Sequence, residues 1–454
     1  MQAKENQQRP QVVIIGAGFG GLEAARKLAH APVDVLLIDR NNYHAFWPLL
    51  YQVATSGLEP QEIASPIRGL IRGWRNVRFQ IAEVERIDFE AQDVITDAGS
   101  FHYDELVLSV GSTNNFFGLH DVEKHGFGFK ELPEALAVRN HILMCFERAT
   151  TITDPAQLKQ LLTFVVVGGG PTGVEMAGAI AELIRYVLSK DYPALEIAQT
   201  RVLLVEMMDR VLPPFPAGLA QCAQKKLDRL GVELHLGQNV SGFDGEVLHL
   251  KDGTDIPTRT VIWAAGVQGA ELTTTLGMPL ERGRRVRVTP ELRLPDRDNV
   301  WVLGDMAYLE NRRDGKPYPQ LATVAMQQGR QVAENLRRKL KGQPLQAFQY
   351  LDKGSLATVG RNFAVARIWR TNWSGFPAWL LWLGVHILYL SGIRNRLLVL
   401  LNWVYNYLTF DRAARAIFRA DPGVLFEDPS AAATTPELPA ETPAPDTPVP
   451  AAVR

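Results

Sequence analysis

Two glycine clusters, about 150 residues apart, are the part of the sequence most suited to chemistry. The first follows the apolar run 11–15 and matches the spacing G-x-G-x-x-G, with glycines at Gly16, Gly18, Gly20 and Gly21. In this motif one glycine allows a tight turn, the next lets a pyrophosphate approach the backbone, and the last lets helix and strand pack closely. The segment 22–30 reads as the helix whose N-terminus would face the phosphate. The cluster predicts a dinucleotide site; the alternative is a glycine-rich turn without a ligand.

An acidic residue completes this first unit. Asp39 ends the strand predicted over 33–39 and follows Gly21 by eighteen residues. A carboxylate at this position can accept a hydrogen bond from a ribose hydroxyl. Strand, helix and acid together make the motif much more specific than the glycines alone.

The second cluster repeats the pattern. The sequence predicts a strand over 164–167, a helix over 174–189 and a further strand over 201–206, and the turn before the helix contains Gly168, Gly170 and Gly173. Glu206 takes the place of the acid. A carboxylate there repels a 2′-phosphate, which favours NADH over NADPH. Arg201 and Arg210 flank this strand and can weaken that preference.

Three other segments end an apolar strand with glycine, as the closing turns of such domains do. Two of them place Gly111 and Gly266 at strand ends, and each alone is equally well explained as a plain buried strand. The third, over 300–305, ends in Gly304 and Asp305. Glycine permits close backbone approach, and the aspartate can accept a hydrogen bond from a ribityl hydroxyl. Its position after the second unit favours a flavin contact over an ordinary turn.

These units predict an α/β fold with two Rossmann-like dinucleotide-binding domains, the second inserted in the first. The insertion follows because the flavin-type motif comes after the second unit. A C-terminal amphipathic helical section that anchors the chain to a membrane is also expected. The predicted boundaries are 1–10 for a flexible N-terminus, 11–120 and 291–344 for the two parts of the first domain, 121–290 for the second domain, 345–427 for the membrane-associated section and 428–454 for a disordered tail.

The composition limits the class of protein. The 454-residue chain has a net charge of -1 at pH 7 and no nucleic-acid-reading motif, so a nucleic acid partner is not expected. No metal site is expected either. Its two cysteines, Cys145 and Cys222, form no CxxC pair, which excludes vicinal-dithiol chemistry and favours a reducing compartment. Residues 1–10 lack the apolar core of a signal peptide, which predicts a location on the cytoplasmic side.

Two apolar blocks near the C-terminus predict a surface that meets lipid. The first, 377–390, is fourteen residues long, which is too short to span a bilayer. The second block is 397–410. Within it and just before it, Asn395, Asn402, Asn406 and Thr409 recur at helical spacing and form a narrow polar stripe opposite a broad apolar face. Basic residues surround the blocks, namely Arg394, Arg396, Arg412, Arg415 and Arg419, and the blocks themselves contain aromatic residues suited to a membrane interface, among them Trp379, Trp382 and Trp403. This pattern predicts two helices lying in one leaflet, as a peripheral or monotopic anchor. Core helices or a hydrophobic interface in a homodimer are the alternatives.

Taken together, the motifs resemble those of the two-dinucleotide-binding flavoprotein superfamily. Within it they resemble the type II NADH:quinone oxidoreductases, the non-proton-pumping NADH dehydrogenases. The resemblance covers about residues 10 to 425, and its specific segments are 13–21, 167–175, 303–305, 322–329 and 352–355. It implies FAD in the first domain and NADH in the second. It also implies electron transfer from NADH through FAD to a membrane quinone, in a respiratory chain and without proton pumping.

The resemblance also assigns roles to single residues. Glu175 matches a glutamate near the nicotinamide and flavin that is implicated in proton transfer. Gln327 matches the second glutamine of the quinone motif, and Thr323 replaces the first, so half of that polar pair is missing. Lys353 matches a lysine near flavin and quinone. Simpler readings stay open for each: a solvent-facing acid, a helix-surface amide and a solvated loop charge.

The residues predicted to contact FAD are Gly16, Gly18, Gly20, Gly21, Asp39, Arg40, Val84, Gly111, Asp305 and Lys353. Those predicted to contact NADH are Gly168, Gly170, Gly173, Glu206 and Gly266, and those predicted to contact quinone are Thr323, Gln327 and Lys353. The cysteine count argues against disulfide reductases and sulfide:quinone oxidoreductases. A reductase of a soluble carrier such as ferredoxin or rubredoxin, and a non-enzymatic flavin sensor, remain as alternative functions.

Overall fold

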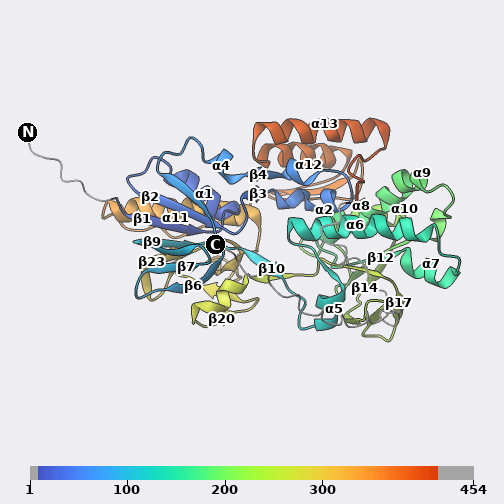
Figure 1. Ribbon diagram of the computed structural model, residues 1–454, viewed down its shortest axis with the longest axis horizontal. Helices are drawn as coiled ribbons and strands as arrows, with labels where there is room; N and C mark the ends of the chain where they lie inside the picture. The colour runs from blue at the N-terminus through green and yellow to red at the C-terminus, as the bar shows by residue number, and fades with distance from the viewer. Residues whose placement is uncertain (1–8, 418–454) are drawn as a thin grey trace, which may run out of the picture. The chain divides into compact units, whose positions relative to one another are not determined.

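The first glycine cluster lies on a six-stranded sheet with the strand order β22-β23-β9-β1-β2-β5 (Figure 1). The computed structural model describes residues 9–417, so most of the expected flexible N-terminus, Arg419 and the expected tail over 428–454 lie outside the described residues. All the strands of this sheet except β22 run parallel. Their bounds are β1 (Gln11–Ile15), β2 (Asp34–Asp39), β5 (Val77–Ile81), β9 (Glu105–Leu108), β22 (Arg293–Leu294) and β23 (Arg297–Val302).

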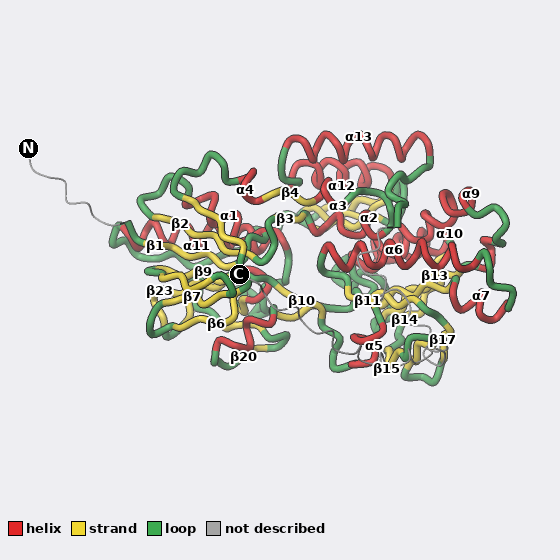
Figure 2. Tube along the Cα trace, in the orientation of Figure 1, coloured by secondary structure: helices red, strands yellow, loops and turns green. Residues whose placement is uncertain are grey.

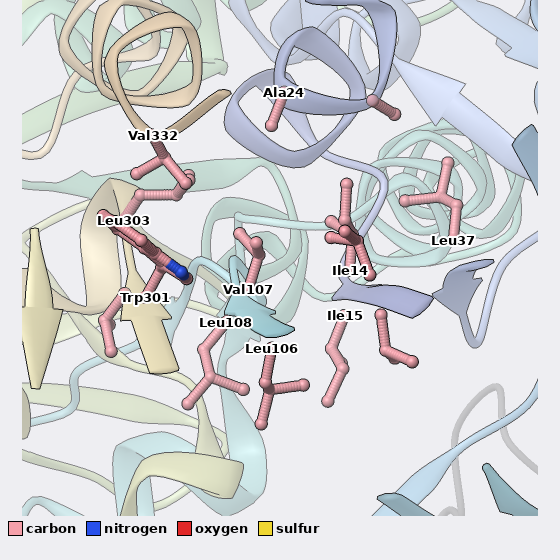
Figure 3. Packing of buried hydrophobic residues seen from close by; sticks show 14 of the residues in the cluster. Ile14, Ile15, Ala24, Leu37, Leu106, Val107, Leu108, Trp301, Leu303 and Val332 are labelled. Atoms are coloured by element: carbon pink, nitrogen blue, oxygen red, sulfur yellow. The ribbon is translucent and has the colours of Figure 1, made fainter. Parts of the chain in front are cut away.

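The core of this unit forms because its strands are short apolar runs covered on both faces. Figure 3 shows the packing of side chains from β1, β9 and β23 with residues of two helices, α1 (Phe19–Leu28) and α11 (Ala322–Leu340). Helix α1 begins at Phe19, inside the glycine cluster, whereas the sequence predicted a start at residue 22. It ends at Leu28, short of the predicted end at His30, because Ala29 already leaves the helical backbone (ψ 127°) and His30 is left-handed (φ 70°).

The second glycine cluster lies on a five-stranded parallel sheet with the order β11-β18-β12-β13-β14. Its strands are β11 (Phe127–Gly128), β12 (Thr163–Val167), β13 (Arg201–Glu206), β14 (Val232–Leu236) and β18 (Thr260–Trp263), and its longer helices are α6 (Leu132–Ala149), α8 (Pro171–Leu183) and α10 (Ala217–Leu230). Helix α8 begins at Pro171 and gives way to a π-helical turn over Ile184–Leu188, where the sequence predicted one helix over 174–189. All these strands fall between β9 and β23 in sequence.

The C-terminal section combines a three-stranded antiparallel sheet with a helical hairpin. Its strands are β25 (Ser355–Thr358), β26 (Ala364–Ile368) and β27 (Thr371–Gly375), and its helices are α12 (Phe376–Tyr389) and α13 (Ile393–Thr409). Helix α12 packs on this sheet and runs beside α13 (Figures 1 and 2). Helix α13 also packs on α3 (Pro60–Ile63), a short helix of the N-terminal part of the chain.

Shorter elements connect these parts. A two-stranded antiparallel sheet of β10 (Ser112–Asn114) and β19 (Val267–Gly269) pairs the segments that follow β9 and β18. The remaining main elements are β3 (Tyr43–Ala45), β4 (Ala64–Pro66), β6 (Val84–Asp88), β7 (Asp93–Thr96), β8 (Gly99–His102), β15 (Val240–Phe243), β16 (Val247–Leu250), β17 (Asp255–Pro257), β20 (Leu280–Glu281), β21 (Arg285–Arg287), β24 (Ala307–Tyr308), α2 (Leu50–Ala54), α4 (Ile67–Leu70), α5 (His120–His125), α7 (Pro155–Leu161), α9 (Ser189–Asp191) and the 3₁₀ turn η5 (Gly304–Met306).

The contact between α1 and α11 can be tested with a matched pair of glycine substitutions. A Cβ at Gly329 of α11 would overlap the carbonyl oxygen of Gly20, whereas a Cβ at Gly218 of α10 would meet nothing within 4 Å. We expect Gly329→Ala to lower the free energy of unfolding by about 2 kcal/mol. Gly218→Ala should raise it by roughly 0.5–1 kcal/mol, since alanine favours helix. Thermal melts of both variants measure this, and a Gly329→Ala melt equal to wild type would refute the close packing.

Candidate functional site

The first glycine turn is held by the acid at the end of β2. The N–H of Gly16 donates to Ile38 O (2.8 Å), and Asp39 Oδ2 accepts from the N–H of Ala17 (2.6 Å). Burial raises the pKa of Asp39, while the backbone N–H groups of Ala17 and Asn41, which both donate to its carboxylate, lower it. A Cβ at Gly21 would overlap the Gly16 carbonyl oxygen, and a Cβ at Gly18 would meet nothing within 4 Å. The N-terminus of α1 therefore faces open space of the kind that a phosphate needs.

The second glycine turn has the same construction. The N–H of Gly168 donates to Val205 O (2.8 Å), and Glu206 Oε2 accepts from the N–H of Gly169. Its other oxygen accepts from Met208 N–H (2.8 Å). A Cβ at Gly173 would overlap the Gly168 carbonyl oxygen, whereas a Cβ at Gly170 would meet nothing within 4 Å. Both predicted acids thus act directly on the backbone of their turns, a role that the sequence analysis did not assign.

The other predicted cofactor contacts lie in three settings. Gly111 and Gly266 stand just before the paired strands β10 and β19, and Gly111 has a left-handed backbone (φ 76°). Asp305, on η5, accepts from Ser112 Oγ (2.6 Å) and pairs with Lys130 Nζ (3.3 Å). Arg40 forms an ion pair with Glu131, and Val84 begins β6 and packs against the first core.

A further side chain supports the Gly304-Asp305 turn and was missed by the sequence analysis. Gln328, on α11, is buried, and its Oε1 accepts from Gly304 N–H (2.7 Å). The family motif includes its neighbour Gln327 and gives no role to position 328. The helical spacing of buried residues on α11 could have identified Gln328 as facing the core.

Glu175 is the fifth residue of α8, at the start of its second turn, and is only 8% exposed. Its Oε1 accepts from Thr358 N–H (3.1 Å) and from the indole N–H of Trp382 (3.3 Å). Burial raises the pKa of Glu175 to about 8, and the two donors oppose this shift. The reading of a solvent-facing acid is therefore wrong. A carboxyl that holds its proton at neutral pH can act as a proton donor.

The three residues predicted to contact quinone have protein partners of their own. Thr323 Oγ1 bonds to Tyr350 OH (2.9 Å), and Lys353 Nζ donates to Tyr389 OH (3.2 Å). The amide of Gln327 bonds to both the N–H and the carbonyl of Leu351, each at 3.0 Å. These bonds bring the predicted residues together around the segment 350–353, which links α11 to the C-terminal section.

An apolar cavity of about 440 Å³ lies between α8, α12, α13 and the N-terminal helix α2. Thr358 and Trp382, the two donors to Glu175, line it. Other lining residues include Tyr51, Gln52, Trp403, Val404, Leu408 and Arg412, whereas Thr323, Gln327 and Lys353 are absent from its lining. At its wall, Gln52 accepts from Trp403 Nε1 (2.7 Å) and donates to Tyr51 OH (2.9 Å).

The polar stripe of α13 docks onto the N-terminal part of the chain. Asn395 Nδ2 donates to Ala64 O (3.3 Å), Asn406 Nδ2 donates to Gly57 O (3.1 Å), and Asn402 donates to Glu62 Oε1. Thr409, the fourth residue of the predicted stripe, is exposed, and its hydroxyl bonds locally to Tyr405 O (2.8 Å) and Asp411 N–H (3.2 Å). The apolar residues Leu397, Leu400, Leu401, Val404 and Leu408 of the same helix are all exposed.

Two features are absent from the part of the chain that the structure describes. Within residues 9–417, no group of three or more metal-ligating side chains is arranged to hold a metal ion. In the same part of the chain, no helix has both the length and the apolar character needed to cross a bilayer.

Comparison with known proteins gives the family. A model of the pyridine nucleotide-disulphide oxidoreductases matches residues 10–329, and a model of the NDH2 C-terminal domain matches residues 353–412. The type II NADH:quinone oxidoreductase Ndh of Mycobacterium tuberculosis is 40% identical over 425 residues, which cover 90% of each chain. The chain belongs to the type II NADH:quinone oxidoreductase family. A Staphylococcus aureus family member is 30% identical over 80% of this chain and 90% of its own.

Solved structures show the same fold. NDH2 from Plasmodium falciparum in complex with NADH superposes with a TM-score of 0.83 and 18% identity, covering 91% of this chain and all of the other. The sulfide:quinone oxidoreductase of Aquifex aeolicus has a TM-score of 0.67 at 18% identity, over 85% of this chain and 92% of the other. In this type II family member, the mixed α/β fold predicted from the sequence is therefore confirmed.

The raised pKa of Glu175 predicts a pH-dependent stability. The unfolded chain loses this proton near pH 4.3, whereas the folded chain keeps it to about pH 8. Over that window the folded state binds the extra proton, so the free energy of unfolding falls as pH rises, by roughly 5 kcal/mol in total. Glu175→Gln removes this loss. In thermal melts, the melting temperature of Glu175→Gln relative to that of the wild type should rise from pH 5 to pH 8.

The exposed Glu334 of α11 supplies the control for this experiment. Glu334→Gln makes the same chemical change without a buried carboxyl, so its difference from wild type should not change over the same pH range. A Glu175→Gln difference that is constant from pH 5 to pH 8 would contradict the assignment of a buried, protonated carboxyl.

Proposed function

We propose that this chain is a membrane-associated flavoenzyme that passes electrons from NADH through FAD to a quinone, without pumping protons. The observation that carries the proposal is the position of Glu175. It stands near the N-terminus of the helix that follows the second nucleotide turn, at the start of the second helical turn, and its two donors line an apolar cavity of about 440 Å³. A proton donor thus lies between a nucleotide site and a site for an apolar acceptor.

The two glycine turns support the cofactor assignment. Open space at Gly18 and Gly170 leaves both helix N-termini able to receive a pyrophosphate. We assign FAD to the domain formed by 11–120 and 291–344, with Asp305 at its ribityl chain, and NADH to the domain over 121–290. Strands β9 and β23 pair directly in the first sheet, although the strands of the second sheet lie between them in sequence. This arrangement supports an inserted domain.

The exposed residues of the C-terminal section support contact with lipid. Apolar side chains occupy the outer surfaces of α12 and α13, among them Phe376, Leu380, Leu388, Leu397 and Leu401. We assign the described part of 345–427 to an anchor lying in one leaflet, and we propose the cytoplasmic side as its location. The expected homodimer stays a prediction of the sequence.

The chain's own residues supply position and one proton. NADH releases a hydride, which amounts to two electrons and one proton, so forming a quinol consumes one further proton. Bound FAD supplies the two-electron relay between donor and acceptor. Glu175 carries a proton at pH 7 because burial holds its pKa at about 8. We assign it the delivery of the second proton, and we assign the cavity the role of admitting the quinone.

The soluble-carrier alternative finds less support. A reductase of ferredoxin or rubredoxin needs a polar docking surface and has no use for an apolar cavity beside the proton donor. Exposed leucines such as Leu401, at 64% exposure, favour a lipid partner instead.

Steady-state oxidation of NADH by the purified protein tests the function. We expect a yellow protein whose turnover requires a quinone, with NADPH at least tenfold poorer because Glu206 repels its 2′-phosphate. Glu175→Gln should lower kcat by about hundredfold and leave the KM for NADH nearly unchanged. A colourless protein, or equal rates with ferredoxin and quinone, would refute the proposal.

Two leucines on α13 test the lipid surface without touching the cavity. Leu397 and Leu401 are 56% and 64% exposed and do not line the cavity. The double variant Leu397→Ser, Leu401→Ser should weaken binding to phospholipid vesicles by about thousandfold, since burying each leucine contributes roughly 2 kcal/mol. Leu340→Ser, at the end of α11, is the control. Equal sedimentation of both variants with vesicles would exclude α13 as the anchor.

A further inference from the structure

The contact between Glu175 and Trp382 joins two parts of the chain that are 207 residues apart. We propose that Trp382 is a positioning residue for Glu175: its indole N–H holds one carboxyl oxygen so that the other oxygen is free to carry the transferred proton. This inference rests on the proposed role of Glu175 in proton delivery.

The hydrogen bonds of the carboxyl are unequal. Thr358 N–H and the Trp382 indole N–H both bond to Oε1, at 3.1 and 3.3 Å. Among residues 9–417, no protein hydrogen bond is recorded to Oε2. An indole can only donate and never accept, so it binds the carboxyl in either protonation state but cannot take its proton. The proton is therefore kept on Oε2, away from both donors.

The ring of Trp382 is itself fixed. It is 1% exposed and stacks on His386 at 3.9 Å between ring centroids. His386 Nδ1 in turn bonds to the carbonyl of Trp382 (2.7 Å), one helical turn away. The rings of Tyr51 and Trp403 pack against the indole from other elements, at 6.4 and 5.6 Å. A side chain enclosed in this way aims its N–H in one direction.

Helix α12 has two faces, and this explains why the indole reaches inward. Ala378, Trp382 and His386, four residues apart, are buried. Phe376, Leu380 and Leu388 lie on the opposite side and are exposed. Residues at spacing four share one face of a helix, and an offset of two residues places the other row opposite. The seating of α12 therefore determines where Trp382 points.

Few other charges act on Glu175. Tyr51 of α2 is electrostatically coupled to it, and burial raises the pKa of that phenol far above its usual range. His386 of α12 stays neutral because burial lowers its pKa to about 4. Glu182, two turns further along α8, is bonded to Arg361 N–H and to Arg412. The two neutral donors are thus the groups in direct contact with the carboxyl.

The test uses cofactor-loaded, oxidised protein and infrared spectroscopy. The C=O band of protonated Glu175, identified by its loss in Glu175→Gln, is titrated with pH in the absence of turnover. Trp382→Phe keeps the ring and removes the donor that favours the ionised form. We expect the midpoint to move upward by roughly half a pH unit or more. Trp373→Phe, which removes an exposed indole N–H bonded to Thr371, should leave the midpoint unchanged.

Kinetics with a short-tailed quinone provide the second readout. Because Glu175 must be protonated to donate, kcat falls as pH rises through its pKa. Trp382→Phe should move this fall to higher pH and lower kcat at pH 7 about tenfold, with the KM for NADH unchanged. Replacing Trp382 by the near-isosteric β-(3-benzothienyl)alanine, which has sulfur in place of N–H, should give the same shift and the same loss of kcat. Because this analogue keeps the shape of the indole, its effect cannot come from altered packing.

The outcomes separate the two proposals. If the infrared midpoint stays unchanged in both Trp382 variants, the positioning role is overturned even when Glu175→Gln abolishes the alkaline fall. If Glu175→Gln retains that fall, the proposed proton delivery is overturned. A shifted midpoint together with a shifted fall in kcat supports both.

Discussion

A carboxylate that accepts backbone N–H groups from a glycine turn is the interaction on which both sheets depend. Asp39 holds Ala17 N–H and Glu206 holds Gly169 N–H, each from the end of the neighbouring strand. Space for a phosphate requires turns without side chains, so nothing within the turn can fix its shape. The acid supplies that fixation from outside. The same carboxylate-to-turn contact occurs on both sheets and fixes the N-termini of α1 and α8. Glu175 lies on α8, so its position is fixed as well.

The strands and turns were predictable because their signals are local. Val13 to Ile15 and Val165 to Val167 are continuous apolar runs followed at once by glycine, so a short window of sequence suffices. The start of α1 was predicted too late because glycines inside a helix read as turn. The polar stripe of α13 was predicted as a stripe, but periodicity alone could not tell whether it faces protein or water.

The surroundings of Glu175 were not predictable in the same way. Thr358 and Trp382, which donate hydrogen bonds to Glu175, are separated from it by 183 and 207 positions in the sequence. Gln52 and Trp403, which bond to each other, are separated by 351 positions. Only the packing of the C-terminal section on α8 creates these contacts. Family motifs identified the acid itself, while the cavity beside it consists of side chains whose types carry no signature of their own.

The four-residue spacing along α12 makes its length informative. Each residue turns a helix by about 100°. One residue inserted between Ala378 and Trp382 would therefore rotate everything beyond it by that angle, so that a row now facing protein would face sideways and exposed leucines would turn towards the interior. A substitution on the exposed row leaves the direction of Trp382 unchanged, whereas an insertion or deletion changes that direction. Deletions and insertions in this helix are therefore expected to be far rarer among functional variants than substitutions on its outer row.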